Sequence, residues 1–331
     1  MLTGAQSKAF LGLESTFGQG TESNLKYKLP LKTESLNRKI DMITSEAILG
    51  ARAPKALAPG KLSAEGSMDI ELWPKLEGVL FYLTLGKATL EDPDGTASSG
   101  DEYTSITPID VGEDLPSSVV LVDHAGIKML YKGMKINQLR LSAAIGSIPS
   151  VSVDFVGREE TVTTATIDES SMTKPDTQPY TFKEISLLYS SDGSSFSSTE
   201  KYTNFELTIN NNLDTDDYRY DGTGLRKTLS PANLEITGNV DIIFDTSTLN
   251  EEYEDKFVNA KPWGIQAVFE KNYNGTTYKF ELILPSVIFS ELTHDISDKG
   301  RLVLSGSFTA VLPSSGSIIT VNDYNNTTGS Y

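Results

Sequence analysis

Side chains that could carry out catalysis or bind zinc are few in this sequence. It contains no cysteine, which excludes disulfides, thiol nucleophiles and the common cysteine zinc sites. The two histidines, His124 and His294, do not stand at a metal-ligand spacing. His294 directly precedes Asp295, but such sequence neighbours occur more often at strand ends and turns than in catalytic pairs. We therefore predict no catalytic residue and no zinc site.

The acidic stretches offer the oxygen ligands that calcium prefers, but not its loop pattern. LDTDDYRYDG at 213–222 and EDPDG at 91–95 are the richest in aspartate. Neither has the twelve-residue spacing that ends in a bidentate glutamate. The stretch GARAPKALAPGKL at 50–62 also fails as a phosphate loop, because Leu62 stands where Ser or Thr would hold magnesium. We predict no metal and no cofactor.

The charge of the chain is strongly acidic, with 28 basic and 45 acidic residues and a net charge of −17. No cluster of Lys and Arg is present that could neutralise phosphates, so we expect neither tight nucleic-acid binding nor docking on an anionic membrane. The first residues lack the apolar core of a signal peptide, and no segment approaches the roughly 20 apolar residues of a membrane helix. We expect the chain to be made and kept in the cytoplasm unless an assembly carries it out.

The elements that must carry the function are mostly strands. Apolar and polar residues alternate with a period of two, which is typical of strands with one buried face. Clusters of Gly, Ser, Asn and Asp, such as SSDGSS and YNGTT, separate these strands. The alternating segments lie at 24–31, 151–156, 204–210, 278–285 and 301–312. The sequence therefore predicts a mainly β protein, and its length suggests two domains.

Two stretches have helical spacing instead. PKLEGVLFYLTLG at 74–86 starts with a proline, which favours the first helical position, and ends at a glycine. TLNEEYEDKFVNA at 248–260 opens with Thr248 and Glu251, which together predict a capping box. We expect two amphipathic helices. The residues expected to pack them onto the sheets are Leu76, Val79, Leu80, Leu83, Leu249, Tyr253 and Phe257.

A repeated stretch connects the two halves of the chain. LAPGKLSAEGSMDI at 57–70 returns as LSPANLEITGNVDI at 229–242, with six of fourteen positions identical. A predicted helix follows each copy within a few residues. The identical positions are Leu57, Pro59, Leu62, Gly66, Asp69 and Ile70, matched by Leu229, Pro231, Leu234, Gly238, Asp241 and Ile242. The shared order of elements favours a duplication over chance similarity between strands.

The duplication predicts two domains with a connecting segment. We place the first domain at 1–157, a linker or exposed hairpin at 158–180 and the second domain at 181–331. The acidic, irregular region from Leu90 to Ser118 is expected to be a solvated loop inserted in the first copy. Because no active site is evident, a protein of this kind is expected to work by assembling or by binding.

Two other functions stay open at this point. A two-domain adhesin or carbohydrate-binding module could use Trp73, Trp263 and some of the fourteen tyrosines to stack on sugars. A β-sandwich glycosidase would act through a pair of carboxylates, and counting alone does not exclude such a pair among 45 acidic residues.

Several segments of the first half share features with one known family. ESTFG at 14–18 is followed by LPLKTESL at 29–36 and by an arginine at 52. EGSMDIELWPKLEGVLFYLTLG at 65–86 has a glycine-containing strand that leads into a short helix, and YKGMKINQLRLSAAIGSIPSVSVDFVG at 131–157 reads as a closing strand pair. With these features the chain resembles the tail tube proteins of long-tailed bacteriophages.

The resemblance implies an architecture and a way of working. It implies two tandem tail-tube-type β-sandwich or barrel domains, each with one helix, and no enzymatic activity. In that family six domains form a ring around a channel, and stacked rings form the tube through which the genome leaves the capsid. A chain with two domains would then form trimeric, pseudo-hexameric rings.

The implied partners are other copies of the chain and other tail proteins, such as the tape measure and tail terminator proteins. DNA would pass through the tube without specific binding, and no membrane is involved. The protein would be assembled in the host bacterial cytoplasm and end in the virion tail. The tube of a contractile injection system, or another tail component such as a terminator, is a related alternative.

Overall fold

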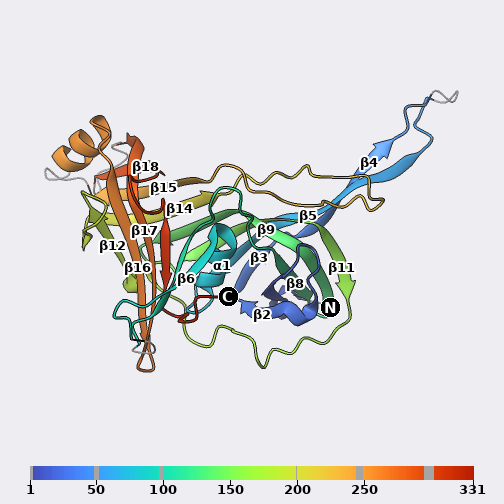
Figure 1. Cartoon of the computed structure of the whole chain (residues 1–331), viewed down its shortest axis with the longest axis horizontal. Coiled ribbons are helices and arrows are strands. Elements are labelled where there is room, and N and C mark those ends of the chain that lie inside the picture. The colour runs from blue at the N-terminus through green and yellow to red at the C-terminus, as the bar shows by residue number, and fades with distance from the viewer. Residues whose placement is uncertain (1–2, 48–51, 97–99, 199, 244–248, 294–301) are drawn as a thin grey trace.

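The computed structural model describes residues 3–47, 52–96, 100–198, 200–243, 249–293 and 302–331 (Figure 1). The predicted mainly β class is confirmed, and every pairing between its named strands is antiparallel. The first half contains η1 (Gly4–Gln6), β1 (Lys8–Leu13), η2 (Glu22–Asn24), β2 (Leu25–Leu29), β3 (Leu31–Glu34), β4 (Asn37–Thr44), β5 (Leu57–Glu71), α1 (Glu77–Leu85), β6 (Gly86–Glu91), β7 (Tyr103–Pro108), β8 (Ser118–His124), β9 (Ile127–Ala144), β10 (Ser150–Gly157) and β11 (Glu159–Thr163). The second half contains η3 (Phe182–Glu184), β12 (Ile185–Ser190), β13 (Ser197–Ser198), β14 (Tyr202–Asn210), β15 (Glu235–Ile243), η4 (Leu249–Val258), β16 (Trp263–Tyr273), β17 (Thr276–Thr293), β18 (Val303–Ala310) and β19 (Thr320–Asp323).

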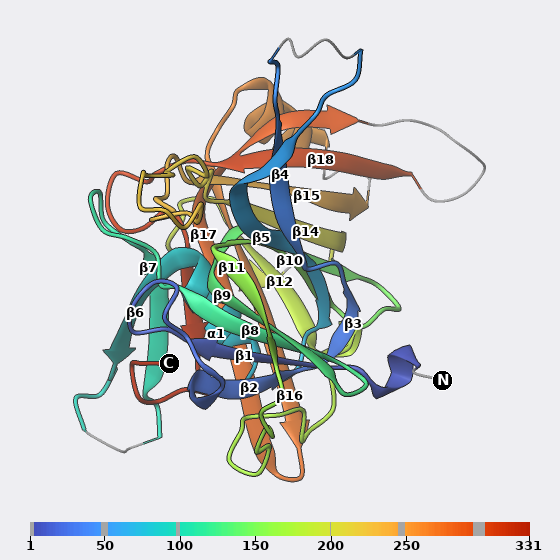
Figure 2. The same ribbon diagram turned by 90° about the vertical axis from the view of Figure 1, so that its right-hand side faces the viewer.

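A continuous sheet extends through both halves of the chain. Its strand order is β3 with β4, then β5, β10, β9, β14, β15, β18 and β17. Figure 2 shows several of these strands side by side. The long strands β9 and β17 continue beyond this sheet, where they pair with β8 and β16. Strands β1 and β12 pair in turn with β8 and β16, so each half adds a second group of strands to the common sheet.

The two halves of this sheet repeat one pairing pattern. Gly66 on β5 pairs with a phenylalanine of β10, and Gly238 on β15 pairs with a phenylalanine of β18. The next strand then carries a one-residue bulge beside that phenylalanine, at Asn137 in β9 and at Ser290 in β17. Bulges are specific features of a ladder. The matched positions therefore align β3 and β4 with β14, β5 with β15, β10 with β18 and β9 with β17.

The repeated glycine has the same steric cause in both halves. A Cβ atom on Gly66 would overlap the backbone carbonyl of Ser35, and one on Gly238 would overlap that of Glu206. Ser35 and Glu206 are corresponding positions of the aligned strands. Only glycine allows the neighbouring backbone to approach this closely, so the chain has a glycine at this position in each copy.

The outer part of the repeated stretch lies in two different environments. Leu57 stands on the projecting hairpin that β4 forms with the first half of β5, which we call the arm (residues 37–44 and 57–63; Figure 1). Leu229 instead lies in a long segment between β14 and β15, which we call the strap (residues 211–234). Leu57 is exposed, whereas Leu229 is fully buried.

Helix α1 differs from its prediction at its start and in its burial. It begins at Glu77 and not at Pro74, because Lys75 adopts a left-handed φ of 73° that interrupts the helix. Its end at Gly86, with φ 96°, is as predicted. The helix is not amphipathic, because core residues enclose it on almost every side. Its buried residues are Glu77, Gly78, Val79, Leu80, Phe81, Leu83, Thr84 and Leu85, and Leu76 just before it is buried as well.

Helix η4 covers part of the second half and is a π-helix. Tyr253 and Phe257 are partly buried and pack against the main core. Between them Lys256 is buried and forms an ion pair with Glu252, with 2.8 Å between Nζ and Oε1. The predicted cap at Thr248 and the side chain of Leu249 lie outside the described residues.

The acidic region from Leu90 to Ser118 is not simply the solvated loop that its composition predicts. Strand β7 lies within it and pairs with β6 on one side and with the C-terminal strand β19 on the other. Thr104 and Ile106 are fully buried on one face of β7. The acidic residues flank this short alternating segment and hide it in the composition.

The core does not divide at the predicted linker. One apolar cluster contains residues of both halves, from Ala9 on β1 to Val321 on β19. The first part of the segment 158–180 forms β11, which pairs with β9, and Tyr180 at its end is buried. None of the helices in the described residues is long and apolar enough to cross a membrane.

We expect Gly66→Ala and Gly238→Ala each to destabilise the fold by about 1–3 kcal/mol, the usual cost of forcing extra atoms into a packed site. Chemical denaturation of each variant measures this loss. Gly4→Ala is the control, because a Cβ atom there meets no atom within 4 Å. Equal stability of all three variants would contradict the steric explanation of the repeat.

Candidate assembly interface

The two halves are joined by backbone pairing between β9 and β14. Seven residue pairs form this ladder, from Asn204 opposite Ala144 to Asn210 opposite Gln138. On one face the facing residues are apolar and fully buried, as for Leu141 opposite Leu207. The junction is thus a regular part of the sheet and buries a share of the common core.

The two outermost strands of this sheet leave edges without a strand partner. Within the described residues, β3 and β4 pair only with β5. At the other end of the sheet, residues 288–293 of β17 pair only with β18. The side of β17 left open there corresponds to the side on which β9 accepts β14. A sheet edge of this kind is a template for pairing with another chain.

Carboxylates of the same chain occupy part of the first edge. The backbone N–H of Leu36 donates to Glu34 at 3.0 Å, and that of Arg38 donates to Glu160 at 2.9 Å. The counterparts of Leu36 and Arg38 in the second half are Leu207 and Ile209, which pair with β9. These side-chain bonds satisfy two edge amides that would otherwise face solvent.

Opposite charges stand at corresponding points of the two edges. Lys39 corresponds to Asn210, and Glu291 corresponds to Gln138, the residue opposite Asn210 in the junction. Lys39 and Glu291 are both exposed, and Lys39 Nζ lies 2.6 Å from Glu65 Oε1 of its own chain. The internal junction is neutral at this position, whereas the two outer edges carry complementary charges.

One face of the continuous sheet is polar and mainly acidic. Buried apolar residues alternate along each strand with polar residues that point to this face. The hydroxyl of Thr33, and next that of Ser152, lower the pKa of Asp69 by hydrogen bonding, so it stays ionised on this face. Asp241 accepts a hydrogen bond from Ser305 at 2.7 Å in the corresponding place. Charged residues of the face include Asp69, Asp154, Glu206, Asp241, Glu291 and Arg140.

A cluster of buried polar groups connects α1 to the C-terminal segment. Glu77 Oε1 accepts hydrogen bonds from Tyr180 at 3.1 Å and from Asn325 at 2.7 Å. Asp323 Oδ2 accepts one from Tyr331 at 2.7 Å. Burial raises the pKa of Asp323 to about 6. Burial first, and then the nearby Asp323, raise the pKa of Glu77 well above its usual range.

His124 and the aspartate-rich loop at 91–95 are the places where the structure can be checked for catalytic or metal-binding side chains. His124 Nδ1 lies 3.7 Å from Glu34 Oε1 at an exposed strand end, whereas His294 and Asp295 lie outside the described residues. Carboxylates of Asp92, Asp94 and Asp101 come within 4.8 Å of one another. The spacing within EDPDG did not reveal this cluster, because Asp101 joins it from beyond the loop, and exposed acidic groups commonly gather without an ion.

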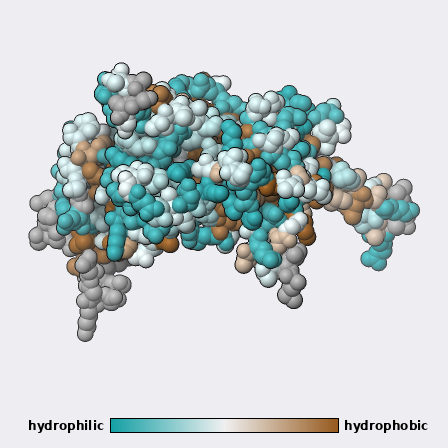
Figure 3. All heavy atoms as spheres, turned by 90° about the horizontal axis from the view of Figure 1, so that it is seen from below, coloured by the Kyte–Doolittle hydropathy of each residue, from teal (hydrophilic) through white to brown (hydrophobic). Residues whose placement is uncertain are grey.

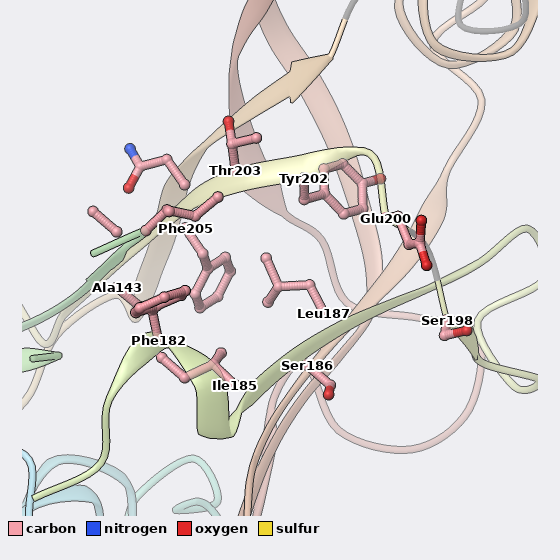
Figure 4. Close-up of a pocket in the computed structure, with 13 residues that line it drawn as sticks. Ala143, Phe182, Ile185, Ser186, Leu187, Ser198, Glu200, Tyr202, Thr203 and Phe205 are labelled. Carbon is pink, nitrogen blue, oxygen red and sulfur yellow. The ribbon is translucent and has the colours of Figure 1, made fainter. Parts of the chain in front are cut away.

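A pocket beside the junction lies between β12 and β14 (Figure 4). Ile185 and Leu187 line it from β12, and Tyr202 and Phe205 line it from β14. Its walls are about equally polar and apolar, and Glu200 is the one carboxylate that the described residues bring into it. Trp263 is 1% exposed in the nearby core and stacks on Tyr202, so it offers no surface for a sugar.

Comparison with protein families gives a match over nearly the whole chain. The model of the family described as phage tail tube protein matches residues 4–326. The chain belongs to the phage tail tube protein family. A search of curated proteins found no match. The resemblance seen in the first half of the sequence is therefore confirmed.

Membership defines the role of this tail tube protein in general terms. It is a structural protein of the phage tail and not an enzyme, and tail tube proteins polymerise. The buried pair Glu77 and Asp323 is accordingly a structural cluster, which agrees with its full enclosure by the fold. The unpaired edges of the sheet are the features that suit polymerisation.

We expect Asp323→Asn to weaken the pH dependence of stability. A carboxyl group whose pKa is raised by folding stabilises the fold fully below its unfolded pKa of about 3.9, and this contribution is lost as the pH rises through about 6. The loss amounts to about 3 kcal/mol at most. Urea unfolding at pH 4.5 and pH 7.5 measures it.

The control for this prediction is Asp255→Asn, which makes the same change of charge at an exposed position of η4. The fall in unfolding free energy between the two pH values should be smaller in Asp323→Asn than in this control. If the two variants fall equally, folding does not raise the pKa of Asp323.

Proposed function

We propose that three copies of this chain close into a ring of six similar units, and that stacked rings form the tail tube through which DNA leaves the capsid. The observation that carries the proposal is the β9–β14 junction, which joins two units of matching register within one chain. The same pairing between chains would join β17 of one copy to β3 and β4 of the next. Two units per chain then require three chains for six positions.

Support for two units comes from the sheet register. Corresponding glycines, bulges and strand order recur in both halves. Tandem tail-tube units at about 1–157 and 181–331, connected through 158–180, are the division that fits this pattern. The shared core indicates that the units fold together rather than as independent domains.

The register of the β9–β14 junction supports a definite set of proposed contacts between chains. Transferring Asn210 opposite Gln138 to the outer edges places Lys39 opposite Glu291 of the next copy. Asn37 comes opposite Thr293 in the same way. Because β17 and β4 are different surfaces, the contact is head-to-tail, and we propose that it closes into a ring rather than continuing as an open helix. On ring closure, the backbone N–H groups of Leu36 and Arg38 would donate to backbone carbonyls of β17 instead of to Glu34 and Glu160.

The polar face of the sheet is suited to line the channel. Carboxylates such as those of Asp69, Asp154 and Glu206 lie on it, and three chains carry a total of 3 × −17 = −51. A wall of this sign repels DNA phosphates, so DNA can slide without being held. The opposite face is apolar and packs into the core.

Further partners follow from the assembly itself. A tube needs other tail proteins inside it and at its ends, and tape measure and terminator proteins would fill these places. The protein would be assembled in the host cytoplasm and function in the virion tail. We do not favour the carbohydrate-binding alternative, because Trp263 and most of its aromatic neighbours lie in the core.

We expect Glu291→Lys to weaken ring formation and Lys39→Glu combined with Glu291→Lys to restore it. The single change places two lysines opposite each other at each contact between chains, and like charges across a ladder are destabilising by up to about 1 kcal/mol per pair. Mass photometry measures the concentration at which rings form, and negative-stain electron microscopy shows their shape.

Asp255→Lys is the matched control, because it makes the same change of charge at an exposed position of η4 that is not part of the proposed ladder. Trimeric rings with six lobes support the proposal. Rings of hexameric mass would contradict two positions per chain, and a double variant no better than the single one would contradict this register.

A further inference from the structure

The strap crosses the first half of its own chain. Asn211 donates to the backbone carbonyls of Thr84 and Ile136, at 2.9 and 3.0 Å. Arg226 Nη1 donates to the carbonyl of Gly157 at the end of β10, at 3.0 Å. The segment continues to β5, where the N–H of Leu62 donates to the carbonyl of Gly224. The strap thus leaves the end of β14 and passes over β9, β10 and β5.

Buried apolar and charged contacts hold the strap in place. Leu213 and Leu229 form a small buried cluster with Leu115 and Val156 of the first half. Beside them, Lys135 is almost fully buried and donates to the carbonyl of Leu229 at 2.8 Å. Desolvation lowers the pKa of Lys135.

The arm is the counterpart of the strap. Both connect the same two strands of a unit, since the arm lies between β3 and the paired part of β5 and the strap lies between β14 and β15. Counted from the aligned ladder, Met42 corresponds to Leu213. Leu57 and Pro59 correspond to Leu229 and Pro231, which are identical residues.

The corresponding residues differ sharply in exposure. Leu213 is 8% and Leu229 0% exposed, whereas Met42 is 54% and Leu57 63% exposed. Ile43 of the arm is also exposed. Apolar side chains are visible along the projecting arm in Figure 3. Several large apolar residues on one thin hairpin indicate a surface that another molecule covers.

We propose that the arm lies across β17 and β18 of the neighbouring copy in the same ring, as the strap lies across β9 and β10 within the chain. This inference rests on the proposed ring. It assumes that two units meet in the same way between chains as the two halves meet within one chain. The partner is a second copy of this chain. Arms and straps would then alternate around one face of the ring, each covering the next unit.

The receiving surface offers an exposed apolar side chain, Leu312, where the arm would pass. Gly157, which accepts the hydrogen bond from Arg226, corresponds to Ala310 at the end of β18. Leu312 follows two residues later and is 72% exposed. Val156, which packs with Leu229 in the small cluster, corresponds to Thr309. Leu57 of the arm is therefore expected near Thr309 and Leu312 of the neighbour.

Cysteine cross-linking tests this placement, because the chain has no cysteine of its own. A full-length double variant, Leu57→Cys with Thr309→Cys, is assembled and treated with a short bismaleimide. The expected product is a covalent ladder that ends at three chains. The control for ring closure is Asn37→Cys with Thr293→Cys, which places one cysteine on each edge of the proposed ladder.

The outcomes separate the arm from the ring. A ladder that continues beyond three chains overturns the inference, because the arm then reaches an adjacent ring. The inference is also wrong if the control pair links three chains while the arm pair links none. If neither pair links and no rings are seen, the proposed function itself fails, and the placement of the arm fails with it.

A second measurement does not depend on cross-linking. Leu57→Ser and Met42→Ser should leave the unfolding of the monomer nearly unchanged, since both side chains are already exposed in a single chain. They should raise the concentration needed for rings several-fold. Val111→Ser is the matched control, because Val111 is exposed in a loop away from the arm. Equal assembly of all three variants would overturn the inference.

Discussion

The structure depends above all on the need of each strand to satisfy its backbone hydrogen bonds. Within the chain, β9 meets this need by accepting β14, and the two halves become one sheet with one core. The sheet then ends in β4 on one side and β17 on the other, where the same need is unmet by any described strand. An unsatisfied edge has to be capped, hidden or paired. The side-chain caps from Glu34 and Glu160 cover only two amides, and pairing with another copy would cover the rest of the edge.

The same ladder explains which residues the two halves share. The glycine and the aspartate of the repeat each serve the pairing of neighbouring strands. Gly66 and Gly238 allow a neighbouring backbone to approach closely. Asp69 and Asp241 accept hydrogen bonds from hydroxyl groups on neighbouring strands. The helices that follow are under no such common requirement. Helix α1 is enclosed by core residues, whereas η4 lies over the second half with an exposed side. Similarity between the halves is therefore strongest in the strands.

The sequence predicted the features that depend on local pattern. Period-two alternation located β10, β14, β17 and β18, and the repeat marked the corresponding strands β5 and β15. Features that depend on distant contacts were missed. The acidic composition around β7 concealed a strand that pairs with β6 and with β19, and β19 lies more than two hundred residues away. The pairing of β9 with β14, the caps on Leu36 and Arg38, and the buried cluster of Glu77 and Asp323 leave no trace in spacing, because their partners come together only in the fold.

Charge sets a limit on how strongly copies of this chain can associate. A net charge of −17 per chain opposes any closed ring, and this repulsion falls as salt screens it. In the proposed ring the favourable contacts are short-ranged: backbone hydrogen bonds along the edges, apolar cover for the arm and local pairs such as Lys39 with Glu291. Short-range contacts act only when the edges meet in register, whereas the long-range repulsion acts in every orientation. The acidic surface that would keep DNA from adhering to the wall would thus also disfavour wrong pairings, so the proposed acidic wall and accurate assembly would follow from one property of the chain.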